Sequence, residues 1–378
     1  MMNVLILSCN TGEGHNYAGK ALKECILSHG DNAELVDIML LAGKRISRLV
    51  GGSYIGIVTH APRLFQLLYK AGTLVSSKKR KSPVYYANTL LAERLKKYLD
   101  SHPCDVIVTV HLFAAETLTY MKQKGMLKQK VVAVETDYTC IPFWEETNCD
   151  AYIIPHASLA EEFTKKGIPA HKLKPYGIPV RKAFADAGSK NHARKICRIP
   201  ENAHVYLIMS GSMGFGKIPF FVAELLKTLS VNEYIIVICG NNKKLRKILQ
   251  KSFQTQENIR ILGYTEHISA YMDASDVLFT KPGGLTSTEA AVKEIPIVHT
   301  RPIPGCETRN LEFFTTHGLS LTSRRFHGQI CAGQNLLRDE ELKHAMCAAQ
   351  KRTIAKDAAQ KTYQLLREFT EAAGGSHV

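Results

Sequence analysis

The sequence lacks the cysteine patterns of a zinc-binding or disulfide-rich protein. Its ten cysteines are scattered, with no pair at CxxC spacing and no histidine at zinc-finger spacing. Isolated cysteines of this kind are typical of reduced thiols. We therefore expect a cytosolic protein.

Long apolar runs are missing too. The opening run, residues 3–8, is too short for the hydrophobic region of a signal peptide and has no basic segment before it. Charge or glycine interrupts every later run before it reaches the roughly 20 residues that a spanning helix needs. We expect a protein that is not secreted and that contacts membranes only peripherally. Its 378 residues, 45% of them hydrophobic, suffice for two domains with separate cores.

Acidic residues are absent from one long segment. None lies between Asp37 and Glu93, whereas nine basic residues do: Lys44, Arg45, Arg48, Arg63, Lys70, Lys78, Lys79, Arg80 and Lys81. Apolar and aromatic side chains are interleaved with these cations. Such a segment suits an anionic membrane surface, where each Lys or Arg contributes about 1 kcal/mol, and a solvated loop over buried helices is the alternative. No helix-turn-helix, RNP or finger signature accompanies the net charge of +15, so we expect no nucleic-acid partner.

Short apolar runs alternate with helical stretches in two series along the chain. The first series places strands at residues 4–7, 106–110 and 131–134 and a helix at 17–29. The second places strands at 205–209, 234–239, 259–262, 277–280 and 297–300 and helices at about 219–229 and 243–252. This alternation predicts two doubly wound α/β units. Residues 174–180 contain two prolines and a glycine, which predicts a linker between the two units. The apolar spacing of residues 339–373 predicts one or two helices at the C-terminal end of the chain.

A glycine-containing turn follows the first predicted strand. Gly12 and Gly14 allow a tight turn with close approach to a ligand, and His15 follows them before the first predicted helix. Histidine is well suited to deprotonate a hydroxyl near neutral pH. A structural turn with a capping histidine is the alternative, because the turn has neither a third glycine nor a Walker lysine.

A second polar turn, Glu135 to Trp144, follows the strand at 131–134. Ligands bind at the carboxyl ends of strands in doubly wound sheets. Asp137 could orient His15 or act as a base itself, and Phe143 and Trp144 could line an acceptor site. Alternatively, Asp137 caps a turn and Trp144, the only tryptophan, packs in the core.

Two further glycine-rich turns occur in the second series. Residues 210–217 place three glycines and Lys217 where a strand gives way to a helix, an arrangement that can hold a diphosphate, with a flexible turn as the alternative. Residues 280–289 end a strand in Gly283 and Gly284 and open a helix that carries Thr286 and Glu289. A carboxylate at position 289 can accept both hydroxyls of a ribose.

Together these motifs resemble the monogalactosyldiacylglycerol synthase and processive diacylglycerol glucosyltransferase family. The matching elements are Lys-Pro-Gly-Gly-x-Thr-x-x-Glu-Ala from Lys281, Pro-x-Pro-Gly-x-Glu from Pro302 and Thr-Gly-x-Gly-His from Thr11. Glu135-Thr-Asp137 with Trp144 looks like the family's Thr-Asp and downstream Trp. The resemblance covers about residues 1–370, and more distantly the chain is similar to the N-acetylglucosaminyltransferase that completes lipid II.

The resemblance implies a GT-B fold, in which two Rossmann-like domains enclose a cleft and a C-terminal helix crosses back. Residues 1–178, joined by a helix at about 346–372, would form the acceptor- and membrane-binding domain, and residues 179–345 the nucleotide-sugar domain. It also implies an inverting mechanism with His15 as the base and Asp137 as the second candidate, without a metal or other cofactor.

Carried over by position, the family's pattern assigns further residues. The diphosphate would lie on Gly211, Ser212, Gly214 and Gly216, the α-phosphate near Gly283, Gly284 and Thr286, and the ribose on Glu289. Gly305, Cys306, Glu307 and Asn310 would face the hexose, and Gly12, Gly14, Phe143 and Trp144 the acceptor. Family members commonly have Gln where this chain has Cys306, which removes a hydrogen-bond partner of the sugar and leaves its identity open.

The expected function is transfer of a hexose from a UDP-sugar to a lipid, first of all diacylglycerol, at the cytoplasmic face of the cell membrane. The protein would attach peripherally to an anionic surface through residues 44–81. A polyprenyl-lipid acceptor is an alternative. Two other functions are possible from the sequence: a UDP-sugar 2-epimerase, which needs no lipid acceptor, and a non-catalytic homologue that binds a lipid or a nucleotide.

Overall fold

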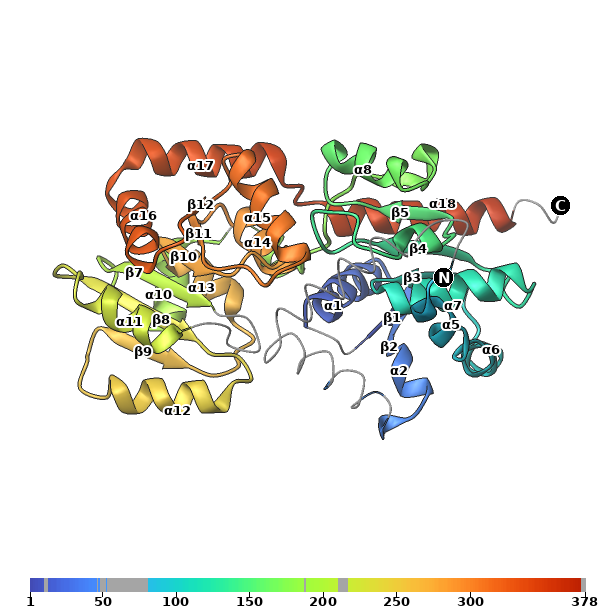
Figure 1. Cartoon of the computed structure of the whole chain (residues 1–378), viewed down its shortest axis with the longest axis horizontal. Coiled ribbons are helices and arrows are strands. Elements are labelled where there is room, and N and C mark those ends of the chain that lie inside the picture. Colours follow the sequence, from blue (N-terminus) through green and yellow to red (C-terminus); the bar gives the residue numbers. More distant parts are fainter. Residues whose placement is uncertain are drawn as a thin grey trace. The chain divides into compact units, whose positions relative to one another are not determined.

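The chain forms two compact units, each built on a parallel sheet. The computed structural model describes residues 1–9, 13–45, 47, 52, 81–186, 188–209 and 217–374. Unit 1 comprises Met1–Lys182, Pro304–Cys306 and Ala355–Val378, and unit 2 comprises Ala183–Ile303 and Glu307–Ile354. Each contains a six-stranded sheet flanked by helices (Figure 1). The predicted fold class, an α/β protein with two Rossmann-like doubly wound sheets, is confirmed.

The sheet of unit 1 has the order β2-β1-β3-β4-β5-β6, and all its strands run parallel. Its strands are β1 (Asn3–Ser8), β2 (Asn32–Asp37), β3 (Val106–Thr109), β4 (Lys130–Val134), β5 (Ala151–Ile153) and β6 (Leu173–Lys174). Its helices are α1 (Glu13–Ser28), α2 (Ile38–Leu41), α5 (Pro83–Thr89), α6 (Ala92–Ser101), α7 (Leu112–Gln123), α8 (Ala160–Lys165) and α18 (Ala358–Gly374), with short 3-10 turns η1 (Trp144–Glu146), η2 (Ala157–Leu159) and η3 (Ala170–Lys172). The central strands are buried on both faces, which is why they read as continuous apolar runs.

Unit 2 repeats this plan with the order β12-β11-β10-β7-β8-β9, again parallel throughout. Its strands are β7 (His204–Met209), β8 (Glu233–Ile238), β9 (Ile259–Leu262), β10 (Val277–Thr280), β11 (Ile297–His299) and β12 (Leu321–Thr322). Its helices are α9 (Lys182–Ala185), α10 (Lys190–Cys197), α11 (Ile218–Leu226), α12 (Lys243–Ser252), α13 (Ile268–Ala274), α14 (Gly284–Val292), α15 (Cys306–Thr316), α16 (Phe326–Arg338) and α17 (Glu340–Thr353). The first residue of α9 belongs to unit 1, and so does the first residue of α15.

The last helix of the chain packs on unit 1. α18 contacts α1 and β3, and the hydroxyl of Tyr363 donates a hydrogen bond to Asp31 Oδ2 at 2.9 Å. The Tyr363 ring also stacks on His29, with 4.2 Å between ring centroids. Leu365 and Leu366 are buried, and each such side chain contributes roughly 1.5–3 kcal/mol to folding. Unit 1 is therefore completed by the C-terminal end of the chain.

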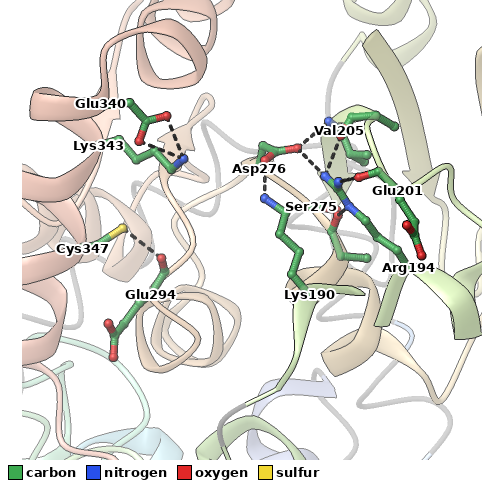
Figure 2. A network of polar contacts seen from close by, with 12 residues as sticks. Lys190, Arg194, Glu201, Val205, Ser275, Asp276, Glu294, Glu340, Lys343 and Cys347 are labelled. Atoms are coloured by element: carbon green, nitrogen blue, oxygen red, sulfur yellow. Dashed lines mark hydrogen bonds and ion pairs between the residues drawn. The ribbon is translucent and has the colours of Figure 1, made fainter. Parts of the chain in front are cut away.

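A buried ion network fixes α10 to the sheet of unit 2. The Asp276 carboxylate accepts hydrogen bonds from Val205 N at 2.8 Å and Arg194 Nη2 at 3.1 Å, and it also pairs with Lys190 (Figure 2). Arg194 makes further bonds to backbone carbonyls, including that of Ala274 at 3.2 Å. The network lies at the amino-terminal ends of β7 and β10. It therefore stabilises the amino-terminal ends of these strands, whereas ligands of doubly wound folds bind at the carboxyl ends.

Three other expectations can be compared with the structure. All ten cysteines are free thiols. No helix within the described ranges is long and apolar enough to cross a membrane. The first helix begins at Glu13, four residues earlier than predicted, so the prediction that Gly14 and His15 precede it is wrong: both lie in its first turn. Gly14 can occupy this turn because glycine is tolerated at helix ends.

Candidate active site

The strand order of unit 1 creates a divergence point beside β1. β1 pairs with β2 on one side and with β3 on the other, so the segments that follow β1 and β3 leave the sheet in different directions. Ligands of doubly wound folds bind at this point, at the carboxyl ends of the strands. His15 follows β1, Val110 and His111 follow β3, and Thr136 follows β4. These groups form the candidate site of unit 1.

His15 is held through one ring nitrogen. Its Nδ1 lies 3.0 Å from the carbonyl oxygen of Val110 and 2.9 Å from Thr136 Oγ1. Because a carbonyl can only accept, the contact with Val110 assigns the proton of the neutral ring to Nδ1. The lone pair is then on Nε2. Burial lowers the pKa of His15, so the ring is neutral near pH 7 and its Nε2 lone pair is available to accept a proton.

Asp137 lies close enough to influence His15 electrostatically. Its carboxylate raises the pKa of His15 and opposes the larger effect of burial. The turn that presents Asp137 is shaped by Glu135, whose Oε1 accepts hydrogen bonds from the backbone of Thr136 at 2.9 Å and of Asp137 at 3.1 Å. Burial, and secondarily the Asp137 charge, raises the pKa of Glu135 well above its usual range. The arrangement can stabilise an imidazolium formed at His15.

A second histidine touches the first. The rings of His15 and His111 meet edge to face with 4.7 Å between centroids. His111 caps α7, because its Nδ1 accepts a hydrogen bond from Phe113 N at 3.1 Å. Burial lowers the pKa of His111 well below its ordinary value, and the neighbouring His15 adds to this. The sequence suggested no role for His111 or Thr136, although His111 directly follows a predicted strand and Thr136 belongs to the Thr-Asp pair that resembles the family's motif.

The residues expected around the acceptor differ in how far they are buried. Gly12 lies outside the described residues, and Gly14 is half-buried at the start of α1. Phe143 is half-buried and has a left-handed backbone, with φ of 79°, which is rare for an aromatic residue and costs strain. Trp144 is only 2% exposed, and its ring lies edge to face with Tyr152. Trp144 therefore packs in the core of unit 1, whereas Phe143 retains an accessible surface.

Unit 2 has its own divergence point, between β7 and β10. β7 pairs with β8 on one side and with β10 on the other. The glycine-rich turn that the sequence predicts after β7 contains Gly211, Ser212, Gly214 and Gly216, all of which lie outside the described residues. The turn after β10 is described and leads directly into α14. The candidate site of unit 2 is built on this turn.

The start of α14 is open to an anion. Gly283 is the residue before the helix, and no side chain there accepts a hydrogen bond from the first backbone N–H groups. A Cβ atom added to Gly283 would meet only Lys281 Nζ at 3.5 Å and Glu307 Oε1 at 4.0 Å, so packing alone does not require glycine. Free N–H groups at a helix N-terminus bind phosphate groups well. Thr286 is half-buried in the first turn, and Glu289 is a buried carboxylate in the second.

Glu307 and Asn310 hold the polypeptide around this turn. Glu307 is paired with Lys281, and its Oε2 accepts a hydrogen bond from Ile303 N at 2.8 Å. Asn310 is fully buried and donates from Nδ2 to the carbonyl of Pro282 at 3.0 Å. Both side chains thus brace the turn after β10. Nearby in the chain, Gly305 has φ of 120°, which only glycine adopts readily, and Cys306 is half-buried at the first position of α15.

A metal site does not emerge from the geometry of the described residues. No three His, Cys, Asp or Glu side chains among them are grouped as metal ligands. The expectation of a mechanism without a metal stays a prediction.

Two family models match the two parts of the chain. Residues 15–180 match monogalactosyldiacylglycerol (MGDG) synthase, and residues 190–352 match glycosyl transferases group 1. Among curated proteins, the chain is 27% identical to a processive diacylglycerol beta-glucosyltransferase of Bacillus subtilis, over 91% of this chain and 89% of that protein. It is also 27% identical to the protein of the same name from Bacillus pumilus, over 94% and 92% of the two chains.

Solved structures share the fold along the whole chain. MurG of Acinetobacter baumannii superimposes with a TM-score of 0.62 at 15% identity, covering 97% of this chain and 100% of its own. The glycotransferase of kitacinnamycin gives 0.67 at 11% identity, with 98% and 99% coverage. A UDP-GlcNAc 2-epimerase from Neisseria meningitidis gives 0.63 at 14% identity, with 97% and 100% coverage.

These identities are too low to transfer a substrate, but the fold and the family matches agree. The chain is a glycosyltransferase with a GT-B fold, and the resemblance to the monogalactosyldiacylglycerol synthase and processive diacylglycerol glucosyltransferase family that its motifs predict is confirmed.

Proposed function

We propose that this glycosyltransferase moves a hexose from a UDP-sugar to the free hydroxyl of diacylglycerol, with inversion at the anomeric carbon. The relatives named processive diacylglycerol beta-glucosyltransferase support a lipid acceptor and a β-linked product. The match to the MGDG synthase model supports the same class of acceptor. The family resemblance supports UDP as the carrier of the sugar.

The geometry of His15 is the observation that carries the proposal. Its Nδ1 is occupied by the Val110 carbonyl and Thr136 Oγ1, so Nε2 is the nitrogen left to act as a base. In the proposed step, Nε2 takes the proton of the acceptor hydroxyl as its oxygen attacks the anomeric carbon. The bond from that carbon to the diphosphate breaks, and UDP leaves with the electron pair. Asp137 and the Val110 carbonyl stabilise the imidazolium that results.

The turn after β10 is the proposed donor-binding site of unit 2. The open N–H groups at the start of α14 would bind the phosphate nearest the ribose, and Gly283 would let it approach the backbone. Glu289 is the proposed ribose ligand. Glu307 and Asn310 would serve the donor mainly by holding this turn in shape, because their polar atoms already contact Lys281, Ile303 and Pro282. The loop after β7 would hold the rest of the diphosphate.

Attachment to the cytoplasmic face of the cell membrane is part of the proposal. It rests on the basic segment of residues 44–81, most of which lies outside the described residues. At its ends, Lys44 and Arg45 are exposed, and Lys81 donates to the carbonyl of Glu146. The fully buried Glu146 carboxylate also accepts from the backbone and hydroxyl of Ser82, at 3.0 Å each. The end of the segment is therefore anchored to the turn that contains Phe143.

A donor screen tests the proposed function. Purified protein is incubated with vesicles of phosphatidylglycerol and diacylglycerol and with each common UDP-hexose separately, and lipid masses and UDP release are followed. We expect a lipid heavier by one or more hexoses with one donor, and NMR of the product should show a β-linkage. Turnover of the UDP-sugar to a new sugar nucleotide without a lipid product would replace the proposal with a 2-epimerase. A product formed only with a polyprenyl phosphate acceptor would also overturn it.

A further inference from the structure

Helix α12 of unit 2 carries a dense group of cations that no carboxylate offsets. Lys243, Lys244, Arg246, Lys247 and Lys251 are all exposed. No acidic residue occurs between Glu233 and Glu257 in the sequence. Within the described part of the chain, none of these five cations forms an ion pair. Elsewhere, exposed helical cations such as Lys96 and Lys361 pair with a carboxylate one turn away.

The charges of α12 work against the stability of the helix. Lys243 and Lys244 stand in its first turn, where the helix dipole disfavours positive charge. Lys243, Lys247 and Lys251 follow one another at spacings of four residues, at which like charges repel. Only the Asn242 cap, which accepts from Leu245 N at 2.9 Å, favours the start of the helix. Folding therefore does not explain this charge pattern, whereas binding to a polyanion would.

An exposed stripe on one flank of α12 includes an apolar side chain. Leu245 and Leu249 are buried against unit 2, where α12 contacts β9 and α11 (Figure 1). Lys244, Lys247, Ile248 and Lys251 follow the i, i+3, i+4, i+7 spacing of a separate stripe. Ile248 is 43% exposed in the middle of these lysines. An isoleucine surrounded by lysines suits the boundary between lipid headgroups and acyl chains better than it suits a nucleic-acid backbone.

We propose that this exposed stripe of α12 is a membrane-contact surface for anionic phospholipid headgroups, with Ile248 entering the interface. It belongs to unit 2 and is separate from the basic segment of residues 44–81, which lies in the sequence of unit 1. The proposal does not depend on which sugar is transferred. Its test measures vesicle binding rather than catalysis, so its failure and that of the proposed function are distinguishable.

Vesicle flotation of the full chain tests this surface. The vesicles are pure phosphatidylcholine, or equal parts phosphatidylcholine and phosphatidylglycerol. The test variant combines Lys244→Gln, Lys247→Gln and Lys251→Gln. The matched control combines Lys195→Gln, Lys351→Gln and Arg352→Gln, which removes the same charge from exposed positions on α10 and α17. Since each lysine near an anionic surface contributes about 1 kcal/mol and each 1.4 kcal/mol is tenfold in affinity, we expect the test variant to bind anionic vesicles roughly 100- to 200-fold more weakly than the wild type.

The control variant should bind within about threefold of the wild type, because its charges would not touch the surface and are screened beyond roughly 10 Å. Ile248→Ser should weaken vesicle binding severalfold without changing the binding of duplex DNA. Equal losses in the test and control variants would overturn the proposal. Loss of DNA binding with intact vesicle binding would also overturn it, in favour of a nucleic-acid surface. Circular dichroism melts confirm that each variant is folded.

Discussion

Thr136→Val tests how His15 is held. Thr136 is 5% exposed and its Oγ1 lies 2.9 Å from His15 Nδ1, so valine keeps the shape of the side chain and removes the hydroxyl. When His15 accepts a proton on Nε2, its Nδ1–H becomes the donor of a charged ring. A hydrogen bond to a charged group contributes about 1.5–3 kcal/mol, so its loss in the transition state should lower kcat roughly 10- to 150-fold.

The pH profile gives this prediction a second readout. His15 acts as a base only when neutral, and loss of the Thr136 oxygen destabilises the charged form, which lowers the pKa of His15 further. The acid limb of kcat/KM should therefore move to lower pH in Thr136→Val. Thr136→Ser is the matched control, because it keeps the hydroxyl and should keep both the rate and the limb. The assigned role of Nδ1 would be refuted if the acid limb of kcat/KM moved to higher pH in Thr136→Val, or if Thr136→Val and Thr136→Ser lost the same fraction of kcat.

Three further substitutions test other parts of the structure. Gly283→Ala should leave the melting temperature unchanged, since the new Cβ meets only Lys281 Nζ at 3.5 Å and Glu307 Oε1 at 4.0 Å, but should weaken UDP binding in calorimetry at least tenfold. Gly333→Ala should do the reverse, because its Cβ would lie 2.3 Å from Phe279 Cζ; overpacking of this kind costs roughly 1–3 kcal/mol of stability. Burial raises the pKa of Glu116 from 4.5 to about 8. Between pH 4.5 and 8 the folded chain therefore keeps a proton on Glu116 that the unfolded chain loses, so the stability of the wild type falls as the pH rises. Glutamine does not titrate, so the melting temperature of Glu116→Gln should exceed that of the wild type by an amount that grows from pH 4.5 to 8. A constant difference across that range would contradict the assignment.

The fold was predictable wherever burial on both faces produced a continuous apolar run. The predicted strand at 277–280 has the bounds of β10, which is buried along its whole length. The predicted strand at 259–262 and helix at 243–252 also have the bounds of β9 and α12, although β9 is only half-buried. β2 was missed because three of its six residues, Asn32, Glu34 and Asp37, are polar, so the segment shows no continuous apolar run. The two- and three-residue strands β5, β6 and β12 are too short to show any period.

The candidate site was predictable only in part, for a physical reason. His15 and the glycine turns have signatures in the local sequence. The groups that orient His15 do not, because one is the backbone carbonyl of Val110 and another is a threonine 121 residues away that the register of β1, β3 and β4 brings close. Similarly, nothing near Glu307 in the sequence predicts its pairing with Lys281 across the turn. The direct sugar contacts expected of Glu307 and Asn310 stay predictions.

The most direct test of the central claim is the initial rate of glycolipid formation by His15→Ala. The matched control is His171→Ala, which removes an exposed histidine of the same unit. With the donor that the screen identifies, general-base catalysis contributes about 10²- to 10⁴-fold, so we expect a loss of that size in His15→Ala, with UDP binding intact and His171→Ala fully active. A His15→Ala rate within a few fold of the wild type would contradict the account and assign the base to another group, of which Asp137 is the first to examine.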